Sequence, residues 1–307
     1  MAKVLVTGGA GFIGSNLVRA LAGRGDDVRV LDNFSTGNRA NLAGLDVEVV
    51  EGELRSYERV HNAVRGVEVV YHLGALGSVP RSVQDPLTSS AVNIEGTLNV
   101  LLAARDEGIR RVVFSSSSSI YGTRRELPVK ENMAPDPISP YGVAKLAAER
   151  YCVSFSRVYH SFETVVLRLF NVFGPRQSPF SQYAAVIPLF ITAVARGEPV
   201  TIEGDGEQSR DFTYVANVVD ATMRAADVPD VNGRIFNVSA GAPATVNELA
   251  DTVGRILGKP VERRHGPPRP GDIRASWADT SEARRLLGYE PRIGLEEGLR
   301  LTADALR

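Results

Sequence analysis

Near its beginning the chain reads Lys3-Val4-Leu5-Val6-Thr7-Gly8-Gly9-Ala10-Gly11-Phe12-Ile13-Gly14. The apolar run 4–6 predicts a buried parallel strand, and apolar residues recur at helical spacing over 12–22. Glycines at Gly8, Gly11 and Gly14 allow backbone N–H groups to approach a diphosphate at the start of that helix. A second strand, 28–32, ends in Asp32, a carboxylate suited to the hydroxyls of an adenosine ribose. The combination predicts dinucleotide binding, and the absence of an arginine directly after the acid favours NAD over NADP.

The bulk composition excludes several classes of protein. The 307 residues suit one two-lobed unit or two closely packed domains, and a net charge of −1 gives no field for nucleic acid or a membrane surface. An anionic substrate must therefore be held by local arginines. Cys152 is the single cysteine, so no intrachain disulfide is possible and we expect a cytoplasmic protein. We expect no metal, because the four histidines lack ligand spacing, and no signal peptide or membrane span.

Apolar strands alternate with helical patterns through the first half of the chain. Further strands are predicted at 47–50, 67–73 and 111–114, and helices at 57–64 and 88–107, with a loop over 74–86. This alternation is typical of an α/β fold, a Rossmann-type doubly wound parallel sheet with helices on both faces. We assign residues 1–170 to an NAD-binding domain to which parts of 205–240 return.

The second half of the chain, mainly 171–307, reads as a smaller C-terminal substrate-binding lobe. It is rich in prolines and loops. A capping box, Thr245 to Glu248, predicts a helix that Gly258 and Pro260 end, and a short helix follows over 281–287.

A second cluster of functional residues lies in the middle of the chain. Tyr141 and Lys145 are four residues apart, so they share one face of the helix predicted to begin at Pro140. A phenol with a pKa of about 10 is a poor base, but a lysine ammonium and a positive nicotinamide would lower that pKa. A run of serines, 115–119, directly follows the strand 111–114 and is read as part of the same site.

With these motifs in place, the sequence resembles an extended short-chain dehydrogenase/reductase of the nucleotide-sugar epimerase/dehydratase group. The motifs that carry the resemblance are the glycine turn 7–14, Leu31-Asp32-Asn33-Phe34, Phe114-Ser115-Ser116-Ser117, Ile120-Tyr121-Gly122, Ser139-Pro140-Tyr141-Gly142-Val143-Ala144-Lys145, the run 167–175, Gly204-Asp205-Gly206 and Arg210-Asp211-Phe212. They are spread over nearly the whole chain and are specific in combination.

The resemblance implies a catalytic set of Ser117, Tyr141 and Lys145. For NAD, it adds to the glycine turn a site made of Gly8, Gly11, Phe12, Ile13, Gly14, Asp32, Asn33, Ser35, Thr36, Gly37, Glu53, Leu54, Leu73, Gly74, Ala75, Asn93, Ser115, Tyr141, Lys145 and Phe170. Glu53 departs from the family pattern, which often has aspartate there. For a UDP-sugar substrate the implied residues are Ser78, Ser117, Ser118, Tyr141, Asn171, Val186, Arg210, Arg269, Asp272 and Ser276, of which Asn171 and Arg210 resemble diphosphate ligands and Arg269 and Asp272 a nucleotide clamp.

The residues after Ser117 bear on the reaction. Related dehydratases carry an Asp-Glu pair there and decarboxylases a glutamate, whereas this chain has Ser118 and Ser119, which cannot act as general acids. This argues against loss of water or CO₂ and leaves 4-epimerisation of a UDP-sugar through a transient 4-keto sugar. A UDP-glucuronate 4-epimerase and a non-catalytic NAD-sensing protein of the same fold stay open as alternatives. The family also implies a homodimer packed through helices near 88–107 and 140–159.

One position in the resemblance concerns the choice of sugar. A tyrosine after the Arg-Pro-Gly-Asp clamp resembles enzymes restricted to glucose and galactose, and this chain has Ser276 there. The stretches 77–82 and 183–188 also look most like the UDP-N-acetylglucosamine 4-epimerase branch. We therefore predict interconversion of UDP-GlcNAc and UDP-GalNAc, with UDP-glucose and UDP-galactose as a second pair.

Overall fold

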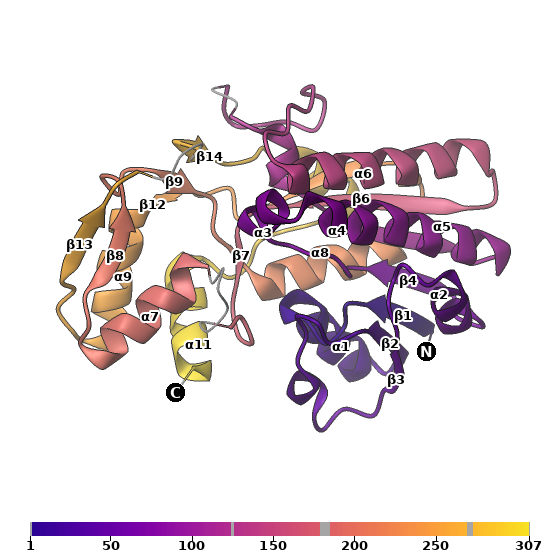
Figure 1. Cartoon of the computed structure of the whole chain (residues 1–307), viewed down its shortest axis with the longest axis horizontal. Coiled ribbons are helices and arrows are strands. Elements are labelled where there is room, and N and C mark those ends of the chain that lie inside the picture. Colours follow the sequence, from indigo (N-terminus) through magenta and orange to yellow (C-terminus); the bar gives the residue numbers. More distant parts are fainter. Residues whose placement is uncertain (1, 124–125, 179–184, 269–272, 307) are drawn as a thin grey trace.

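A seven-stranded parallel sheet forms the centre of the molecule (Figure 1). The structure is a computed structural model that describes residues 2–123, 126–178, 185–268 and 273–306. The strand order is β11-β6-β5-β4-β1-β2-β3, so the order reverses between β1 and β4, the crevice where doubly wound sheets bind dinucleotides. The predicted fold class is confirmed. The strands are β1 Lys3–Thr7, β2 Asp27–Asp32, β3 Glu48–Glu51, β4 Val69–His72, β5 Arg111–Ser117, β6 Glu163–Leu169 and β11 Ile235–Val238.

Helices cover both faces of this sheet because each contributes one apolar stripe to a core. Leu17 and Val18 of α1 and Val218 of α8 belong to the core on one face. Val60 of α2, Leu101 of α5 and others on α6 form the core on the opposite face. These helices are α1 Phe12–Arg24, α2 Tyr57–Val64, α5 Gly96–Asp106, α6 Pro140–Val158 and α8 Val215–Asp227. Strands buried between two such layers are nearly continuous in their apolar character, as the sequence of 4–6 predicts.

Two predicted boundaries are wrong in the segment after β4. The expected loop 74–86 contains a short helix, α3 Val79–Gln84, capped by Ser78, and the expected helix 88–107 is interrupted. It consists of α4 Pro86–Ser90, a π-helical turn η2 Ala91–Glu95, and α5. Helical spacing does not reveal a π turn, since the extra residue shifts the apolar register by one. Similarly, β5 extends beyond 114 to Ser117, because it pairs with β6 over its whole length.

The smaller lobe lies at the left of Figure 1 and is built from helices and short strand pairs. The capping box is confirmed: Thr245 Oγ1 accepts from Glu248 N at 3.0 Å, Glu248 Oε2 accepts from Thr245 N at 2.7 Å, and Gly258 ends the helix in a left-handed conformation. Its helices are α7 Val186–Arg196, α9 Val246–Leu257 and α11 Leu295–Ala305. The helix α10 Ser281–Leu287 packs on β11 and α8 instead, and the 3-10 turns are η1 Arg39–Leu42 and η3 Ser118–Tyr121. The strand pairs are β7 Val172–Phe173 with β10 Thr213–Tyr214, β8 Val200–Glu203 with β13 Arg263–Gly266, and β9 Ser209–Arg210 between β12 Ala244–Thr245 and β14 Ala275–Ser276.

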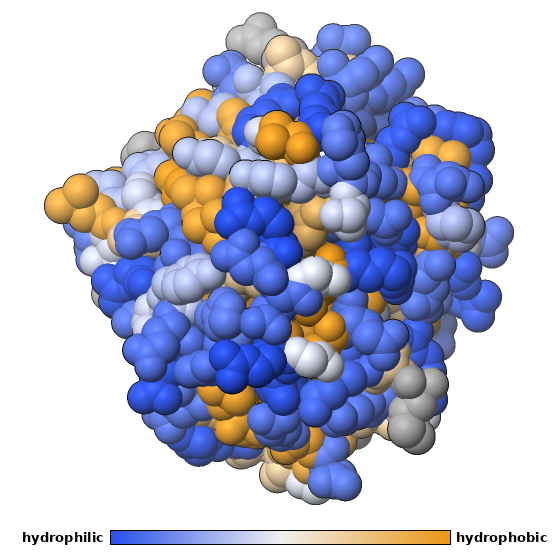
Figure 2. All heavy atoms as spheres, turned by 90° about the vertical axis from the view of Figure 1, so that its right-hand side faces the viewer, coloured by the Kyte–Doolittle hydropathy of each residue, from blue (hydrophilic) through white to orange (hydrophobic). Residues whose placement is uncertain are grey.

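The surface is mainly polar on the face that the right-hand side of Figure 1 presents. Figure 2 shows hydrophilic side chains in the majority there, with apolar ones in small patches between them. Within the described residues, no helix has both the length and the apolar character needed to cross a membrane.

Candidate active site

The glycine turn after β1 is shaped by two different constraints. Gly8 has a φ of +69°, and a Cβ there would lie 2.7 Å from Gly74 Cα. A Cβ at Gly14 would overlap the carbonyl oxygen of Gly8. At Gly11 the φ is −74°, which any residue adopts, and the nearest atom to a Cβ would be Gly8 O at 3.2 Å. Backbone conformation and packing therefore require glycine at positions 8 and 14. At position 11 they require it much less, and a bound ligand would be the main reason for the absence of a side chain.

The turn leads into a helix start that fits a diphosphate. Gly11 is the N-cap of α1. Within residues 2–123, all of which the structure describes, no side chain caps this helix and its first turn contains no acidic residue. Such a helix start offers N–H groups and positive partial charge to an anion. Asp32, at the end of β2, accepts from Ala10 N at 2.9 Å and from Phe34 N at 2.8 Å, so its carboxylate fixes the loops after β1 and β2 relative to each other.

The predicted NAD residues come together at the carboxyl ends of neighbouring strands. Gly8 follows β1, Asp32 ends β2, Leu73 follows β4, Ser115 belongs to β5 and Phe170 follows β6. Asn33 Oδ1 accepts from the backbone N and the hydroxyl of Ser35, which closes the loop that continues through Thr36 and Gly37. Such an edge at a switch point is where α/β sheets bind nucleotides.

Three residues that were predicted to bind NAD or the substrate also bind other residues of the protein. Glu53, after β3, forms an ion pair with Arg55 at the surface. Asn93, in the π turn, binds the backbone of Leu76 at both ends of its amide, at 2.9 and 3.2 Å. Asn93 therefore holds the loop after Ala75 in place. Ser78 caps α3 by accepting from Arg81 N at 3.2 Å.

At the other end of the crevice, a buried hydroxyl supports the assignment of a cofactor. Ser115 Oγ is buried and has no hydrogen-bond partner among the described residues. Its backbone oxygen accepts from Lys145 Nζ at 2.8 Å. A buried polar atom without a partner is rare unless a ligand or water completes it. The orphaned hydroxyl, the uncapped helix and the unneeded glycine at position 11 all fit a dinucleotide lying along this edge.

Tyr141 and Ser117 are the central pair of the predicted catalytic set. Ser139 caps α6 by accepting from Gly142 N at 3.1 Å, and Tyr141 N donates to Ser82 Oγ at 3.1 Å, which together fix the start of the helix. The Ser117 side chain lies beside the Tyr141 phenol and acts to lower its pKa. Ser117 Oγ also accepts from Ser119 N and lies 3.1 Å from Ser119 Oγ. The predicted pair of hydroxyls is therefore in contact, on the end of β5 and the first turn of α6.

The pKa values in the protein alone differ from the sequence-based expectation. Burial raises the pKa of Tyr141, and the Ser117 side chain opposes that rise. Burial lowers the pKa of Lys145 to about 8. The expected lowering of the Tyr141 pKa by Lys145 is thus absent from the protein alone, because the ammonium is directed at the backbone of Ser115. A positive nicotinamide is the remaining charge that would lower it.

A buried ion pair behind the catalytic set was not predicted from the sequence. Arg168 of β6 and Glu149 of α6 are both buried and lie 2.6 Å apart. Ser116 Oγ donates to the same carboxylate at 3.0 Å, and Arg168 Nη1 donates to the Tyr121 hydroxyl at 2.7 Å. These bonds lock β5, β6 and α6 together, and thereby Ser117 to Tyr141. Sequence spacing gives no signal for such a pair, since its members are 19 residues apart.

On the side of the smaller lobe, Arg210 and Ser276 are neighbours. They pair in register across β9 and β14. Asp211, fully buried, accepts from Ala240 N and Gly241 N at 3.0–3.2 Å, and its own N–H donates to Ser276 O at 3.0 Å. Desolvation raises the pKa of this carboxyl. Asp211 therefore holds the two strands that carry the predicted substrate residues.

The other predicted substrate residues lie on separate elements. Asn171 follows β6 with a left-handed φ of 33°, and its carbonyl accepts from Thr213 N. Val186 begins α7 and Ser118 begins η3. Arg269 and Asp272 lie outside the described residues, as does 183–184 of the stretch 183–188.

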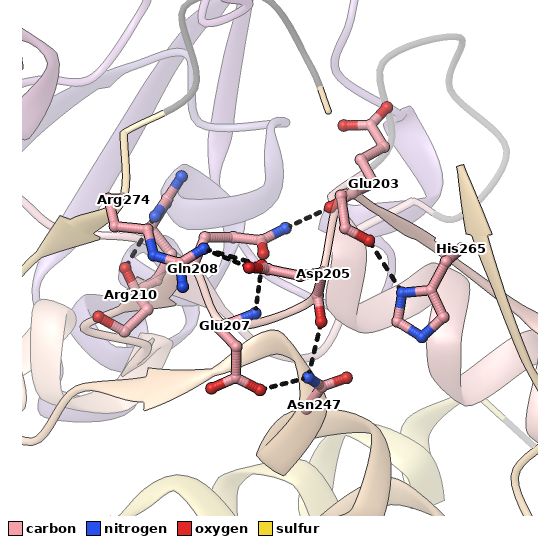
Figure 3. Close-up of polar contacts among 10 residues, drawn as sticks. Glu203, Asp205, Glu207, Gln208, Arg210, Asn247, His265 and Arg274 are labelled. Carbon is pink, nitrogen blue, oxygen red and sulfur yellow. Dashed lines mark hydrogen bonds and ion pairs between the residues drawn. The ribbon is translucent and has the colours of Figure 1, made fainter. Parts of the chain in front are cut away.

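A cavity of about 640 Å³ lies between the ends of β8 and β13 and the residues that precede β9 and β14. Figure 3 shows the polar side chains around it. Arg274 binds Asp205 through two bonds of 2.8 Å, Asn247 donates to Asp205 O, and Gln208 donates to Glu203 O at 2.7 Å. The lining residues are Glu203, Gly204, Asp205, Gln208, His265, Gly266, Pro268, Ile273 and Arg274. Of these residues the sequence singled out only Gly204 and Asp205, and the lining comes from two parts of the chain, 203–208 and 265–274, that are far apart in sequence.

Comparison with known proteins now adds to this geometry. A model of the NAD dependent epimerase/dehydratase family matches residues 4–239. The chain belongs to this family. The predicted family and its NAD cofactor are confirmed, and the predicted NAD-dependent epimerase agrees with the named relatives.

This family member is similar to several epimerases over its whole length. It is 38% identical to a UDP-glucose 4-epimerase of Mycolicibacterium smegmatis, with 99% of this chain and 98% of that protein covered. The UDP-glucose 4-epimerase of Thermotoga maritima, solved with UDP-glucose, and the UDP-N-acetylglucosamine 4-epimerase of Methanobrevibacter ruminantium, solved with UDP-N-acetylmuramic acid, superpose on it. Each of these structures has a TM-score of 0.95 and 39% identity, with 99% of this chain and 98% of the other covered.

Proposed function

We propose that this enzyme inverts C4 of a UDP-hexose, with UDP-GlcNAc and UDP-GalNAc as its main pair and UDP-glucose and UDP-galactose as a second pair. The observation that carries the proposal is the proximity of Tyr141 and Ser117 at the carboxyl edge of the sheet, and the neighbouring Arg210 and Ser276 of the smaller lobe support it. The similar proteins named above act on UDP-sugars, and both substrate types occur among them.

In the proposed mechanism, Tyr141 as phenolate takes the proton of the 4-hydroxyl and later returns it. Ser117 donates to the same oxygen and aligns it with the phenol, since its hydroxyl already contacts Tyr141. When bound, NAD supplies a reversible oxidation at C4. Lys145 and Ser115 would hold its nicotinamide end, and the uncapped start of α1 its diphosphate. The keto sugar turns about its link to the diphosphate before the reduction.

The substrate's diphosphate requires positive charge from the smaller lobe. We assign Asn171 and Arg210 to the diphosphate, and Arg269 and Asp272 to a clamp around the nucleotide. A guanidinium forms two charge-assisted bonds to a phosphate, so Arg210 is the largest expected contributor to affinity among the described members of this set. The uridine would occupy the cavity beside β9 and β14.

The choice of sugar rests on Ser276. Its side chain is half-buried on β14, in register with Arg210, and is much smaller than the tyrosine that fills this position in the glucose-restricted enzymes. A small residue leaves room for a 2-acetamido group without excluding a hydroxyl. We therefore expect Ser276→Tyr to suppress the N-acetylated reaction and to spare UDP-glucose.

The test is kcat/KM for both sugar pairs in the wild type and in Ser276→Tyr. Ser276→Ala is the matched control, because it removes the hydroxyl but keeps the space. An unchanged ratio between the two pairs in Ser276→Tyr, or a wild type that converts only the non-acetylated pair, contradicts this assignment.

Two other functions are separated by the same kind of assay. A UDP-glucuronate 4-epimerase would convert UDP-glucuronate faster than either neutral pair. A non-catalytic NAD-sensing protein would bind NAD and convert none of them. The contact between Tyr141 and Ser117, with Lys145 buried beside them, favours a catalyst, because a sensor has no need of a positioned phenol.

We further propose that two copies associate through α3, α4 and α6. Val143, Tyr151 and Val158 are exposed along one face of α6, and Val83 and Leu87 extend this apolar surface onto the helices packed beside it. Leu87 is 83% exposed, unusual for a leucine with apolar neighbours. Leu87→Asp should give a monomer by light scattering, whereas Leu189→Asp, on α7, should not.

We also propose a cytoplasmic location, since Cys152 is a buried free thiol that suits a reducing compartment.

A further inference from the structure

One side chain joins the helix of the glycine turn to the smaller lobe. Asn16, one turn into α1, donates to Pro175 O at 3.1 Å and accepts from Arg176 Nη2 at 2.6 Å. Its amide also donates to Phe12 O at 2.9 Å, so it is fixed to the first turn of its own helix. Residues 174–176 follow β7 and lead towards α7, which begins at Val186. The contact thus ties the start of the cofactor helix to the segment that enters the substrate lobe.

Both the backbone conformation and the buried guanidinium of Arg176 are energetically unfavourable. Its φ is +70°, a left-handed conformation that non-glycine residues rarely adopt. Its Nε is buried without a hydrogen-bond partner, and no ion pair joins it to a carboxylate within residues 2–123, 126–178, 185–268 and 273–306. Burial and the nearby Arg19 lower its pKa. The positive end of α1 is a further unfavourable neighbour for a cation.

A negative charge at the start of α1 would offset the electrostatic costs, which are the burial of the cation and its repulsion by Arg19 and by the helix. The diphosphate of a dinucleotide carries such charge, and the glycine turn is where it binds in this family. The Arg176–Asn16 contact would then be stronger in the NAD-bound enzyme than in the protein alone. A group with different interaction energies in two states shifts the equilibrium between them.

We propose that Arg176 is a positioning residue that, through Asn16, couples occupancy of the NAD diphosphate site to the placement of the segment leading into the substrate lobe. This inference rests on the proposed binding of UDP-sugars by that lobe. Because such coupling is reciprocal, a nucleotide that fixes the lobe also raises the affinity of the enzyme for the cofactor. We expect the higher affinity to appear as slower release, since affinity differences lie mostly in dissociation rates. The enzyme would thereby retain its reduced cofactor while the keto sugar is present.

The experiment measures the rate of NAD release from the holoenzyme, with and without saturating UDP. We expect UDP to slow release by about tenfold in the wild type, within the usual range of coupling between sites. Arg176→Gly removes the guanidinium and suits the left-handed φ, so the variant should fold. In Arg176→Gly and in Asn16→Ala the effect of UDP should fall below about twofold, and the double variant should show no further loss.

The matched control is Arg196→Ala, an exposed arginine at the end of α7 in the same lobe. It should keep the full effect of UDP. Calorimetric titration of UDP is run in parallel on each holoenzyme. If UDP binds but slows release equally in the wild type and Arg176→Gly, the coupling role is wrong while the proposed function stands. If UDP does not bind the wild type, the proposed function fails and the inference with it.

Discussion

Gly11 offers the sharpest test of the cofactor site, because the protein itself has little need of glycine there. Its φ of −74° and ψ of 179° suit any residue, and an added Cβ would approach only Gly8 O, at 3.2 Å. An alanine needs a shift of a few tenths of an ångström. We expect Gly11→Ala to change the free energy of unfolding of the cofactor-free protein by less than about 1 kcal/mol.

Binding of NAD should respond very differently. A side chain at Gly11 holds the diphosphate away from the N–H groups at the start of α1. Each charge-assisted hydrogen bond lost costs roughly 1.5–3 kcal/mol, which corresponds to a roughly 10- to 150-fold higher Kd. Gly11→Val, with a branched side chain, should abolish binding. The comparison variant is Gly14→Ala, whose Cβ would overlap Gly8 O and which should lose both stability and NAD binding.

The assay pairs thermal unfolding of the cofactor-free variants with calorimetric titration of NAD. Stoichiometric NAD in purified Gly11→Val would show that the glycine turn does not bind the diphosphate. A large loss of stability in cofactor-free Gly11→Ala would show instead that the glycine serves packing.

Three other predictions concern the catalytic and substrate residues. Tyr141→Phe should reduce kcat by at least about 10²-fold with NAD binding intact, and near-normal epimerisation would contradict its role as base. Lys145 has a pKa of about 8 in the folded protein and 10.5 ordinarily. Between these two pH values the unfolded chain keeps a proton on Lys145 that the folded protein has lost. The free energy of unfolding therefore increases as pH rises. In urea unfolding without NAD, the stability of wild type relative to Lys145→Met should therefore increase by roughly 3 kcal/mol from pH 7 to 10.5, whereas a constant difference would refute the burial argument. Arg210→Ala should raise KM by roughly 10- to 150-fold with little change in kcat, and an unchanged KM would exclude a phosphate contact.

Local sequence determined the parts of this protein whose partners are near in the chain. The glycine turn, Asp32 at the end of the second strand, and Tyr141 one helical turn before Lys145 all follow from spacing within about 20 residues. The strand and helix alternation was sufficient for the fold class, because buried parallel strands are apolar runs. The capping box at Thr245 is equally local, since both of its bonds lie within four residues.

Tertiary structure alone decided which distant side chains meet. The pairing of Glu149 with Arg168, the cavity lined by residues from Glu203 to Arg274, and the hydrogen bonds of Asp211 to the backbone of 240–241 depend on how strands and loops pack. It also decided that Lys145 is directed at Ser115 O and that the Tyr141 phenol is desolvated, so that burial raises the pKa of Tyr141 in the protein alone. Asn16 and Arg176 are 160 residues apart, and neither is one of the hydrophobic residues whose spacing predicts a helix or a strand. Polar contacts of this kind depend on positions in space that periodicity does not encode, so only the folded chain reveals them.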